Sequence, residues 1–335
     1  MNPFLPAEWL PVIFAGLMGI SILLYVILDG LDLGIGILSL GQSNEHRDSM
    51  ISSIGPFWDA NETWLVLAIG LLLVAFPLAH GIILTALYLP VALMLIGLIL
   101  RGVAFEFRVK APAHKKPRWN FLFFAGSLLA SLTQGWMLGA YILGFENGLI
   151  PTLFSLLTAI CLTAGYAFMG ACWLIHKSTG VLQRKAIHWA EITLLAVGVG
   201  FAAISIASPL ASPRVFERWF ELPQLLWLAP LPVLAGGIFL WLWSFLRKLP
   251  LPQDRLNWLP LAAAALLFTL AFLGLAYSFF PYIVPDRLTL AQAASAPEAL
   301  SIILIGTLFV LPVILAYSVL AHWVFRGKAT ELTYH

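Results

Sequence analysis

The sequence predicts an all-α integral membrane protein with nine transmembrane helices. Of the 335 residues, 61% are hydrophobic and only 10% are Asp, Glu, Lys or Arg, whereas a typical soluble domain carries about 25% charged residues. The mean hydropathy is +0.94. The apolar residues come in blocks of about 20, the length that a helix needs to cross a hydrocarbon core of about 30 Å. A soluble globular fold is therefore excluded.

Nine apolar blocks bounded by charged residues, Pro or Gly are the predicted spans. They are approximately 10–28, 64–79, 81–100, 120–144, 150–175, 189–208, 223–246, 258–280 and 300–325. Within these helices, most backbone polar groups must find their hydrogen bonds inside the same segment. The second and third blocks meet at Ala79, His80 and Gly81 with almost no spacer. We therefore expect a tight antiparallel hairpin at that point.

The spans divide into two four-helix bundles plus one peripheral helix. We expect the first bundle, with the acidic motifs, in residues 1–148, the second bundle in 149–282, and the ninth helix with the C-terminus in 283–335. The stretches between spans are too short for an inserted soluble domain, which usually needs about 50 residues or more. Any function must therefore lie inside the membrane or at its two surfaces.

The distribution of Lys and Arg predicts the orientation, because cytoplasmic loops hold the excess of basic residues. Fifteen of the 18 basic residues fall in the odd-numbered loops and the C-terminal segment, and only Arg214, Arg218 and Arg287 fall elsewhere. This predicts the N-terminus outside and the C-terminus in the cytoplasm. With no basic residue before the first block, we expect no removable signal peptide. A net charge of +2 does not indicate a nucleic-acid partner.

Two pairs of carboxylates have i, i+3 spacing, which places both members of a pair on one face of a helix. Asp29 and Asp32 follow the first block, and Asp59 and Glu62 precede the second block on the same side of the membrane. An ionisable group at the centre of a membrane helix costs about 2.5–3.5 kcal/mol on insertion scales. Clustered carboxylates raise one another's pKa, and such acids can take up and release protons. The pattern therefore predicts proton handling at this membrane face.

A structural interpretation stays open for the second pair. Acidic residues at a helix N-terminus complement the helix dipole, and this explains Asp59 and Glu62 as well as proton transfer does. It does not explain Asp29 and Asp32, because the first helix is expected to end there and a helix C-terminus disfavours negative charge. For that pair the functional interpretation is favoured.

Other polar and aromatic residues near the spans allow more than one role. Arg101, at the end of the third block, is expected to pair with the acids and to form a structural ion pair with Glu106. Trp58 and Trp64 are either residues of the interfacial aromatic belt or residues that line a pathway. Gln134 lies deep in the fourth block, where an interhelical hydrogen bond is favoured over ligand binding.

The histidines and cysteines argue against a metal or haem in this chain. None of the seven histidines falls in the middle of a predicted span, so embedded haem with bis-His ligation is not expected, and packing explains the Met residues. No CxxC or CxxCH motif is present, which removes zinc modules and c-type haem. Cys161 and Cys172 would lie about 16 Å apart along one helix, which excludes a disulfide between them.

Three motifs, in this order on a nine-span chain, resemble subunit II of the cytochrome bd quinol oxidases, most closely the cyanide-insensitive branch. The resemblance covers the whole length, but the specific motifs lie in the first third of the chain. Two positions depart from the family's pattern, with Leu31 where Phe is common and Ala60 where Gly is common. The motifs are Asp29-Gly-Leu-Asp-Leu-Gly, Gly55-Pro-Phe-Trp-Asp-Ala-Asn-Glu-Thr-Trp and Arg101-Gly-Val-Ala-Phe-Glu-Phe-Arg.

The resemblance implies a haem-free subunit of a terminal oxidase in the bacterial cytoplasmic (inner) membrane. Such an oxidase couples quinol oxidation to the reduction of dioxygen to water and builds a proton motive force. In the family, subunit I holds two b-type haems and one d-type haem, and subunit II stabilises it in an obligate heterodimer. Small single-helix subunits, lipids and a structural quinone can accompany the pair. No catalytic residue or metal ligand is expected in this chain.

The resemblance also assigns roles to individual residues. Asp29, Asp32 and Asp59 match acidic positions of a cytoplasmic proton route, to which Glu62 is added by its spacing and which Trp58 flanks. Trp64 matches the entrance of an oxygen tunnel. The extra methyl of Ala60 lies beside Asp59 but leaves its carboxylate in place.

Two rival functions remain open from the sequence. A secondary transporter would place its carboxylates near the middle of the membrane, at broken helices. Here the acids cluster at one face, and only Gln134 is clearly polar at the midplane, which argues against a transporter. A pure assembly scaffold is the third alternative.

Overall fold

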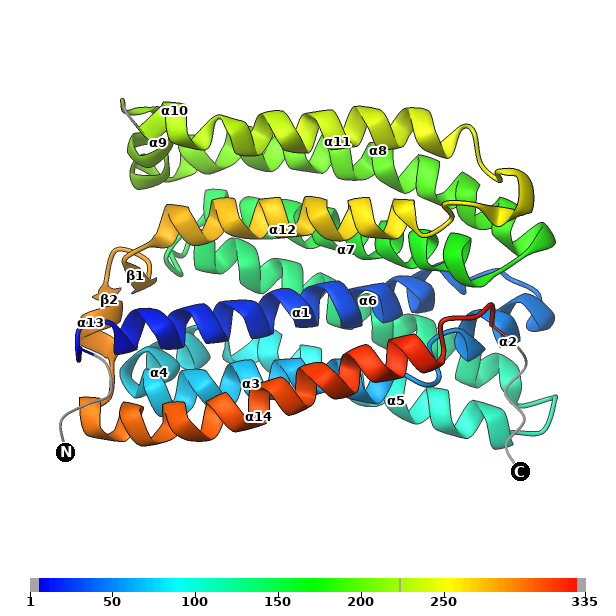
Figure 1. Ribbon diagram of the computed structural model, residues 1–335, viewed down its shortest axis with the longest axis horizontal. Coiled ribbons are helices and arrows are strands. Elements are labelled where there is room, and N and C mark those ends of the chain that lie inside the picture. The colour runs from blue at the N-terminus through cyan, green and yellow to red at the C-terminus, as the bar shows by residue number, and fades with distance from the viewer. Residues whose placement is uncertain (1–5, 223, 330–335) are drawn as a thin grey trace. The chain divides into compact units, whose positions relative to one another are not determined.

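The computed structural model describes residues 6–222 and 224–329, and most of this part is helical (Figure 1). Within these residues, nine helical segments are long and apolar enough to cross a membrane. The predicted fold class and the number of spans are thereby confirmed. The nine are α1 (Leu10–Leu38), α3 (Trp58–Ala75), α5 (Tyr88–Lys110), α6 (Lys116–Ile142), α7 (Leu149–Lys177), α8 (Gly180–Ala211), the pair α10 (Gln224–Leu228) and α11 (Pro230–Leu246), α12 (Leu259–Phe279) and α14 (Pro297–Val324).

Short elements join these spans. The two strands pair antiparallel, with Tyr282 opposite Thr289, and form the connection between α12 and α14. The short elements are α2 (Asn44–Ser52), α4 (Pro77–Ala86), α9 (Pro213–Phe220), the 3₁₀ turn η1 (Pro252–Asp254), β1 (Tyr282–Val284), β2 (Leu288–Thr289) and α13 (Leu290–Ala293).

Helix α1 is longer than the apolar block that predicts it. The block ends near residue 28, but the helix continues to Leu38. Asp29 and Asp32 therefore lie inside the helix, and their predicted position at its C-terminus is wrong. The helix persists through a glycine-rich stretch because Gly34 packs directly on the backbone of Tyr166 in α7, and tertiary packing overrides the weak helix propensity of Gly.

The tight hairpin predicted at Ala79, His80 and Gly81 is also wrong. The chain breaks earlier, at Phe76 (φ −135°, ψ 59°), and then enters α4, which begins with Pro77 at its first turn. Proline is well placed there because the first helical N–H groups need no partner within the helix. A short helix thus separates α3 from α5.

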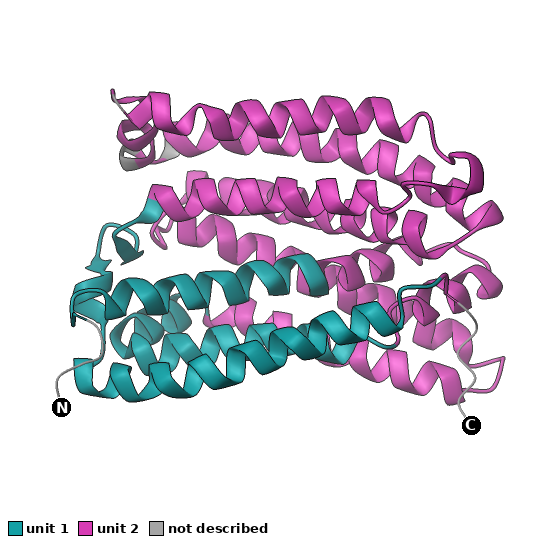
Figure 2. Cartoon of the chain, in the orientation of Figure 1, with its two compact units in different colours: residues 1–29, 56–87, 279–327 teal, residues 30–55, 88–278, 328–335 magenta. Residues whose placement is uncertain are grey.

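By contacts, the chain forms two compact units (Figure 2). Unit 1 comprises residues 1–29, 56–87 and 279–327, and unit 2 comprises residues 30–55, 88–278 and 328–335. The division into bundles at residues 148 and 282 stays a prediction.

In unit 1, α14 runs antiparallel to α3. Near the end of α3, the backbone N–H of Ser295 donates to the carbonyl of Ala75 (2.9 Å) and its hydroxyl donates to that of Val74 (2.7 Å). At the start of α3, the Phe57 ring stacks on His322, with centroids 4.4 Å apart, and meets the edge of Phe325 at 6.0 Å. Both ends of α3 are therefore fixed to α14.

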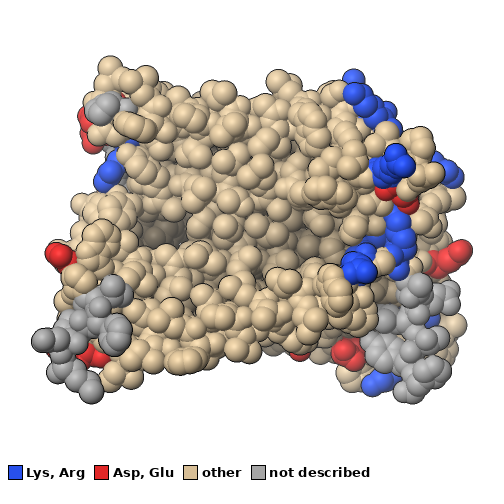
Figure 3. Space-filling view, viewed as in Figure 1, with Lys and Arg blue, Asp and Glu red and all other residues tan. Residues whose placement is uncertain are grey.

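In unit 2, helices that follow one another in sequence pack through small residues. A Cβ atom added to Gly97 of α5 would lie 2.8 Å from the backbone nitrogen of Ala130 in α6, and one added to Gly126 would lie 2.6 Å from the carbonyl of Gly97. Such backbone contact between membrane helices requires glycine. Helices α11 and α12 contain no charged side chain. Figure 3 shows Lys and Arg gathered beyond the ends of these helices.

Candidate functional site

The carboxylates of Asp29 and Asp32 are fully buried, each with 0% of the residue exposed. They lie one turn apart in the interior of α1. Moving a carboxylate out of water is expensive, and a fully buried acid is retained only where its surroundings or its role compensate. Both residues lie well inside the helix, and the partial charges at the two ends of the helix dipole act strongly only within the first and last turns. Dipole complementation therefore does not account for this pair.

The glycines around Asp32 fix this part of α1 against α7. A Cβ added to Gly30 would meet the Tyr166 ring at 2.6 Å, and one added to Gly170 would lie 2.6 Å from the carbonyl carbon of Gly34. Gly34 lies still closer to the backbone of Tyr166. The glycines of the first motif thus serve close helix packing, which leaves Asp32 little freedom to move.

The same tyrosine connects α7 to α6. The Tyr166 hydroxyl donates to the Gln134 amide oxygen at 2.7 Å, and both residues are buried. The expected interhelical hydrogen bond of Gln134 is confirmed. Tyr166 packs against Gly30 on one side and the Phe268 ring on the other, with the centroids of the Tyr166 and Phe268 rings 6.2 Å apart. It therefore connects α7 to three other helices, α1, α6 and α12.

The second acidic pair has a different environment. Asp59 is exposed and Glu62 is half-buried, and both lie in the first two turns of α3. Here the helix dipole favours negative charge, so complementation of the dipole still explains these two residues. Asn61, between them, is buried, and its side-chain amide donates to the carbonyl of Leu28 at 3.4 Å. This bond joins the start of α3 to α1 directly beside Asp29.

The two tryptophans of the second motif also differ. Trp64 is 1% exposed, and within the described residues its indole N–H has no hydrogen-bond acceptor. A residue of the aromatic belt would face lipid and headgroups, so that interpretation does not fit Trp64. Trp58, in the first turn of α3, is half-buried. A pathway role for either residue stays a prediction.

Helix α5 carries two buried arginines seven positions apart, on one face. Arg101 is 2% exposed, whereas Glu106 is exposed, and the ion pair expected between them stays a prediction. Arg108, also 2% exposed, donates from Nη1 to Asp48 Oδ1 at 2.5 Å and from Nε to Asn120 Oδ1 at 2.5 Å. Sequence reasoning missed Asp48 and Asn120. The only sequence signal for a buried polar cluster here was the position of Arg108, which lies two helical turns after Arg101 on the same face of α5.

The Arg108 cluster also affects a neighbouring cation. Burial, together with the positive charge of Arg108, lowers the pKa of Arg47 in α2. Arg47 donates from Nε to the carbonyl of Ser39 at 2.9 Å, just beyond the end of α1. The short helix α2 is therefore anchored to the end of α1 by Arg47 and to α5 by the contact of Asp48 with Arg108, while Arg108 also binds Asn120 of α6.

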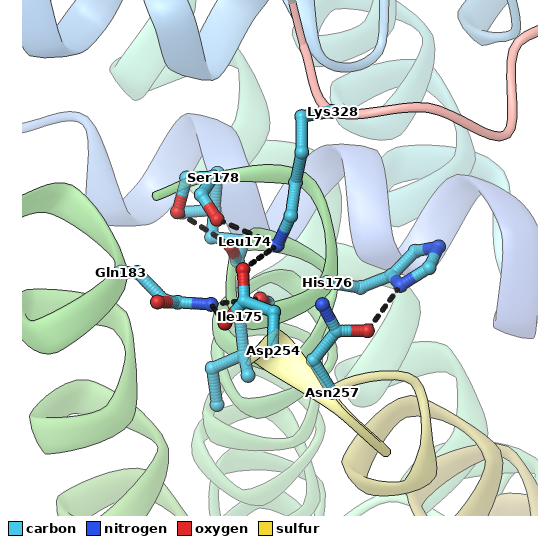
Figure 4. Close-up of polar contacts among 8 residues, drawn as sticks. All are labelled: Leu174, Ile175, His176, Ser178, Gln183, Asp254, Asn257 and Lys328. Carbon is cyan, nitrogen blue, oxygen red and sulfur yellow. Dashed lines mark hydrogen bonds and ion pairs between the residues drawn. The ribbon is translucent and has the colours of Figure 1, made fainter. Parts of the chain in front are cut away.

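A polar cluster at the end of α7 holds the C-terminal segment in unit 2 (Figure 4). Lys328 Nζ contacts Asp254 Oδ2 at 2.8 Å and donates to the carbonyl of Ser178 at 2.9 Å. Gln183 Nε2 donates to Asp254 Oδ1 at 2.8 Å. Burial alone would raise the pKa of Asp254, but the hydrogen bonds of Lys328 and Gln183 and the charge of Lys328 outweigh it and lower that pKa.

The described residues were compared with the side-chain clusters that hold metal ions in proteins. In residues 6–222 and 224–329, no group of three or more His, Cys, Asp or Glu side chains could hold a metal. Near the ends of their helices, the His176 ring is hydrogen-bonded to Asn257 at 3.1 Å, and His322 stacks on Phe57 and contacts the carbonyl of Ser318 at 2.8 Å.

Comparison with known proteins gives consistent matches over more than nine-tenths of the chain. A family model described as cytochrome bd terminal oxidase subunit II matches residues 10–325. The chain is 28% identical to the cytochrome bd ubiquinol oxidase subunit 2 of Bacillus subtilis strain 168, covering 92% of this chain and 93% of that protein. It is 26% identical to the cytochrome bd-I ubiquinol oxidase subunit 2 of Escherichia coli K12, covering 94% of each.

The fold is also found in a solved structure. A chain from the structure of the bd oxidase of Geobacillus thermodenitrificans superposes with a TM-score of 0.73 at 16% identity, covering 95% of this chain and 99% of that chain. At this identity the match shows a shared fold. None of these matches supports the transporter alternative.

Proposed function

Since this chain belongs to the family of cytochrome bd terminal oxidase subunit II, we propose that it works as the haem-free second subunit of a bacterial quinol oxidase that reduces dioxygen to water. Its named relatives are ubiquinol oxidase subunits matched over more than nine-tenths of this chain. It would stabilise a haem-bearing subunit I in an obligate complex of the cytoplasmic membrane. The bias of basic residues supports a cytoplasmic C-terminus.

The proposed contribution of this chain to the reaction is a route for protons from the cytoplasm. The observation that carries it is the complete burial of Asp29 and Asp32 one turn apart in α1. Residues at i, i+3 have Cβ atoms about 5–6 Å apart on a helix, a span that one water molecule or a side-chain rotation can bridge. A buried, closely spaced pair of acids can therefore pass a proton along the helix axis.

Protons would enter at the start of α3. Asp59 is exposed and Glu62 half-buried, so both can exchange protons with water. The Asn61 side chain, hydrogen-bonded to the Leu28 carbonyl at 3.4 Å, fixes this entry beside Asp29. Asp59 and Glu62 thus act as the acceptors at the surface, and Asn61 positions them.

The two tryptophans complete the proposal. Trp58 flanks the entry and shields it partly from lipid. Trp64, buried and apolar over most of its surface, forms the entrance of a dioxygen tunnel, since an apolar gas partitions into an apolar path. Chemistry at the oxygen site, including that of the haems, would belong to subunit I, and no step of the reaction passes through a metal in this chain.

The proposal is tested with Asp29→Asn in the purified complex. Asn has nearly the same shape and no charge, so the complex should assemble with normal haem absorption bands. Quinol-driven oxygen consumption per haem should fall at least about tenfold, the scale of losing a proton-transfer group. Glu45→Gln is the matched control, because Glu45 is an exposed acid in the first turn of α2, and it should stay within about twofold of the wild type. Normal turnover in Asp29→Asn would remove this residue from the route.

A further inference from the structure

The start of α8 forms a cationic groove that the proposed oxidase function does not use. The groove has a volume of about 430 Å³ and is lined by Gln42, Val181, Arg184, Lys185, His188 and Trp189. It lies entirely within unit 2. Among the described residues that line it there is no carboxylate. All of its ionisable side chains are therefore basic.

The lining residues of α8 share one face of the helix. Val181, Arg184, Lys185, His188 and Trp189 follow the i, i+3, i+4, i+7, i+8 pattern of a single helical stripe. Val181, Arg184 and His188 are exposed, and Lys185 and Trp189 are half-buried. The stripe therefore presents its basic side chains outward, at the point where a membrane-spanning helix begins.

The Lys185 side chain is held in place within the groove. Its Nζ donates to the Gln42 amide oxygen at 3.1 Å and lies 3.3 Å from His46 Nδ1. Neither partner is a carboxylate, so they orient the ammonium group without neutralising it. His188 Nδ1 lies 4.0 Å from the Glu191 carboxylate, and this contact leaves Arg184 and Lys185 with their charges.

The same face of α8 continues into the membrane as an apolar path. One turn beyond the basic residues, the exposed fraction of Ile192 is 53%, and Leu195 (47%) and Val199 (70%) follow on the same stripe. Trp189 lies between the basic and the apolar parts, and indole rings prefer the boundary of headgroups and acyl chains. The order along the helix is therefore basic, aromatic and then apolar.

We propose that this face of α8 is a binding site for one anionic phospholipid. The phosphate would contact Arg184, Lys185 and His188, the glycerol region would lie beside Trp189, and an acyl chain would follow Ile192, Leu195 and Val199. Basic pockets on membrane helices recognise anionic headgroups through such point charges. A free phosphate or a soluble phosphate ester would use only the basic part and would leave the apolar path empty.

The site is tested on the purified complex with the double variant Arg184→Gln and Lys185→Gln. After a detergent wash, lipid is extracted and quantified, and the delipidated complex is then titrated with mixed micelles containing phosphatidylglycerol while its Tm is followed. The matched control is the double variant Arg247→Gln and Lys248→Gln, which removes the same charge from two exposed residues just beyond α11. Arg184→Lys with Lys185→Arg keeps the charge.

In the Gln variant we expect the loss of about one retained anionic lipid per complex. We also expect the phosphatidylglycerol concentration at the titration midpoint to rise at least about tenfold, because each basic group near a phosphate contributes substantially to headgroup binding. The control and the charge-conserving variant should stay within about twofold of the wild type. Equal lipid retention in the Gln variant and the wild type would overturn the proposal, as would an equal loss in the control.

Two measurements on the wild-type complex test the proposal even if the Gln variant does not assemble. Phosphatidylcholine micelles should raise the Tm clearly less than phosphatidylglycerol micelles, and glycerol phosphate alone should give no comparable rise. Equal stabilisation by phosphatidylcholine would overturn the selectivity for an anion. Equal stabilisation by glycerol phosphate would show a site for soluble phosphate in place of a lipid.

Discussion

The two acidic pairs of this chain have the same spacing but occupy different environments. Asp29 and Asp32 are fully buried in the interior of α1, whereas Asp59 is exposed and Glu62 half-buried at the start of α3. At α3 the helix dipole and water both stabilise the charge, and at the α1 pair neither does. The same i, i+3 spacing therefore occurs in a surface pair, whose charges cost little free energy, and in an interior pair, whose charges cost much more.

The difference originates in how each helix is held. Gly34 and Gly170 bring the backbones of α1 and α7 into contact, and that contact continues α1 beyond the acids. The α3 pair lies in the first turns of a helix that begins at Trp58 without a side-chain cap, and the start of this helix is held by the side chains of Phe57 and Asn61. We infer that close packing makes the first pair sensitive to shape, whereas the second pair is sensitive only to charge.

The largest effect is expected from breaking the glycine contact. Gly34→Leu would place a side chain where the Tyr166 backbone lies, and overpacking of this kind costs about 1–3 kcal/mol or more, so α1 would separate from α7. We expect less than about a tenth of the normal yield of complex with intact haem bands. The control is Gly16→Leu on the same helix, where an added Cβ meets nothing within 4 Å. A normal yield of the Gly34→Leu complex would contradict the packing argument.

The next effect compares shape sensitivity directly. Asp32→Glu keeps the charge but adds a methylene group at a fully buried position, at a cost of about 1–3 kcal/mol, and we expect oxygen consumption per haem to fall about tenfold. Asp59→Glu adds the same group at an exposed position and should stay within about twofold. For both variants, the measurements are quinol-driven oxygen uptake and the Tm of the complex. Equal sensitivity at the two positions would show that burial does not distinguish the pairs.

A smaller effect is expected from removing one surface charge. Asp59→Asn should lower turnover by about two- to fivefold, because the neighbouring Glu62 and water can still deliver protons at the start of α3. Asp59→Asn combined with Glu62→Gln should lower it further than the product of the two single effects. The rate of proton uptake during turnover is the measurement. A double variant with wild-type uptake would place the entry of protons elsewhere.

The sequence predicted the class of fold and the number of spans because apolar length is a local property that each segment carries by itself. It did not predict the length of α1, because Asp and Gly at residues 29–36 indicate a helix end by local rules. The overriding contact comes from Tyr166 and Gly170, far along the chain. The predicted hairpin at residues 79–81 was wrong for a related reason. Within a continuous apolar block the only local signal of a break is Pro77, which marks the start of a new helix.

The polar contacts divide in the same way. The hydrogen bond of Gln134 was predicted from its place within an apolar block, whereas the burial of Trp64 was not, because the first residue of a block can equally belong to the aromatic belt. Asp48 was missed as the partner of Arg108 because the two are 60 positions apart, and nothing in the local pattern of α2 distinguishes this acid from its exposed neighbours. Sequence patterns thus located the charges that matter, and only the packing showed which of them are paired at long range.

The smallest effect is expected where a charge is half-exposed, at the C-terminal cluster. The side chains of Asp254 and Lys328 are 28% and 33% exposed, so their ion pair should contribute no more than about 1 kcal/mol. Because the pKa of Asp254 is lowered in the folded protein, the contribution is complete above the unfolded value of about 3.9 and is lost as the pH falls through the folded value. Cleavage of the C-terminal segment by a protease should therefore be independent of pH between about 5 and 8 in the wild type.

Asp254→Asn tests this pair against the buried acids of α1. It should accelerate cleavage after Lys328 about two- to fivefold at neutral pH and leave oxygen consumption unchanged, because Asp254 is bound by Lys328 and Gln183, neither of which belongs to the proposed proton route. Asp286→Asn, an exposed acid in the turn between β1 and β2, is the control and should not change the cleavage rate. If Asp254→Asn instead lowered turnover as strongly as Asp29→Asn, burial would not be what separates structural acids from functional ones in this chain.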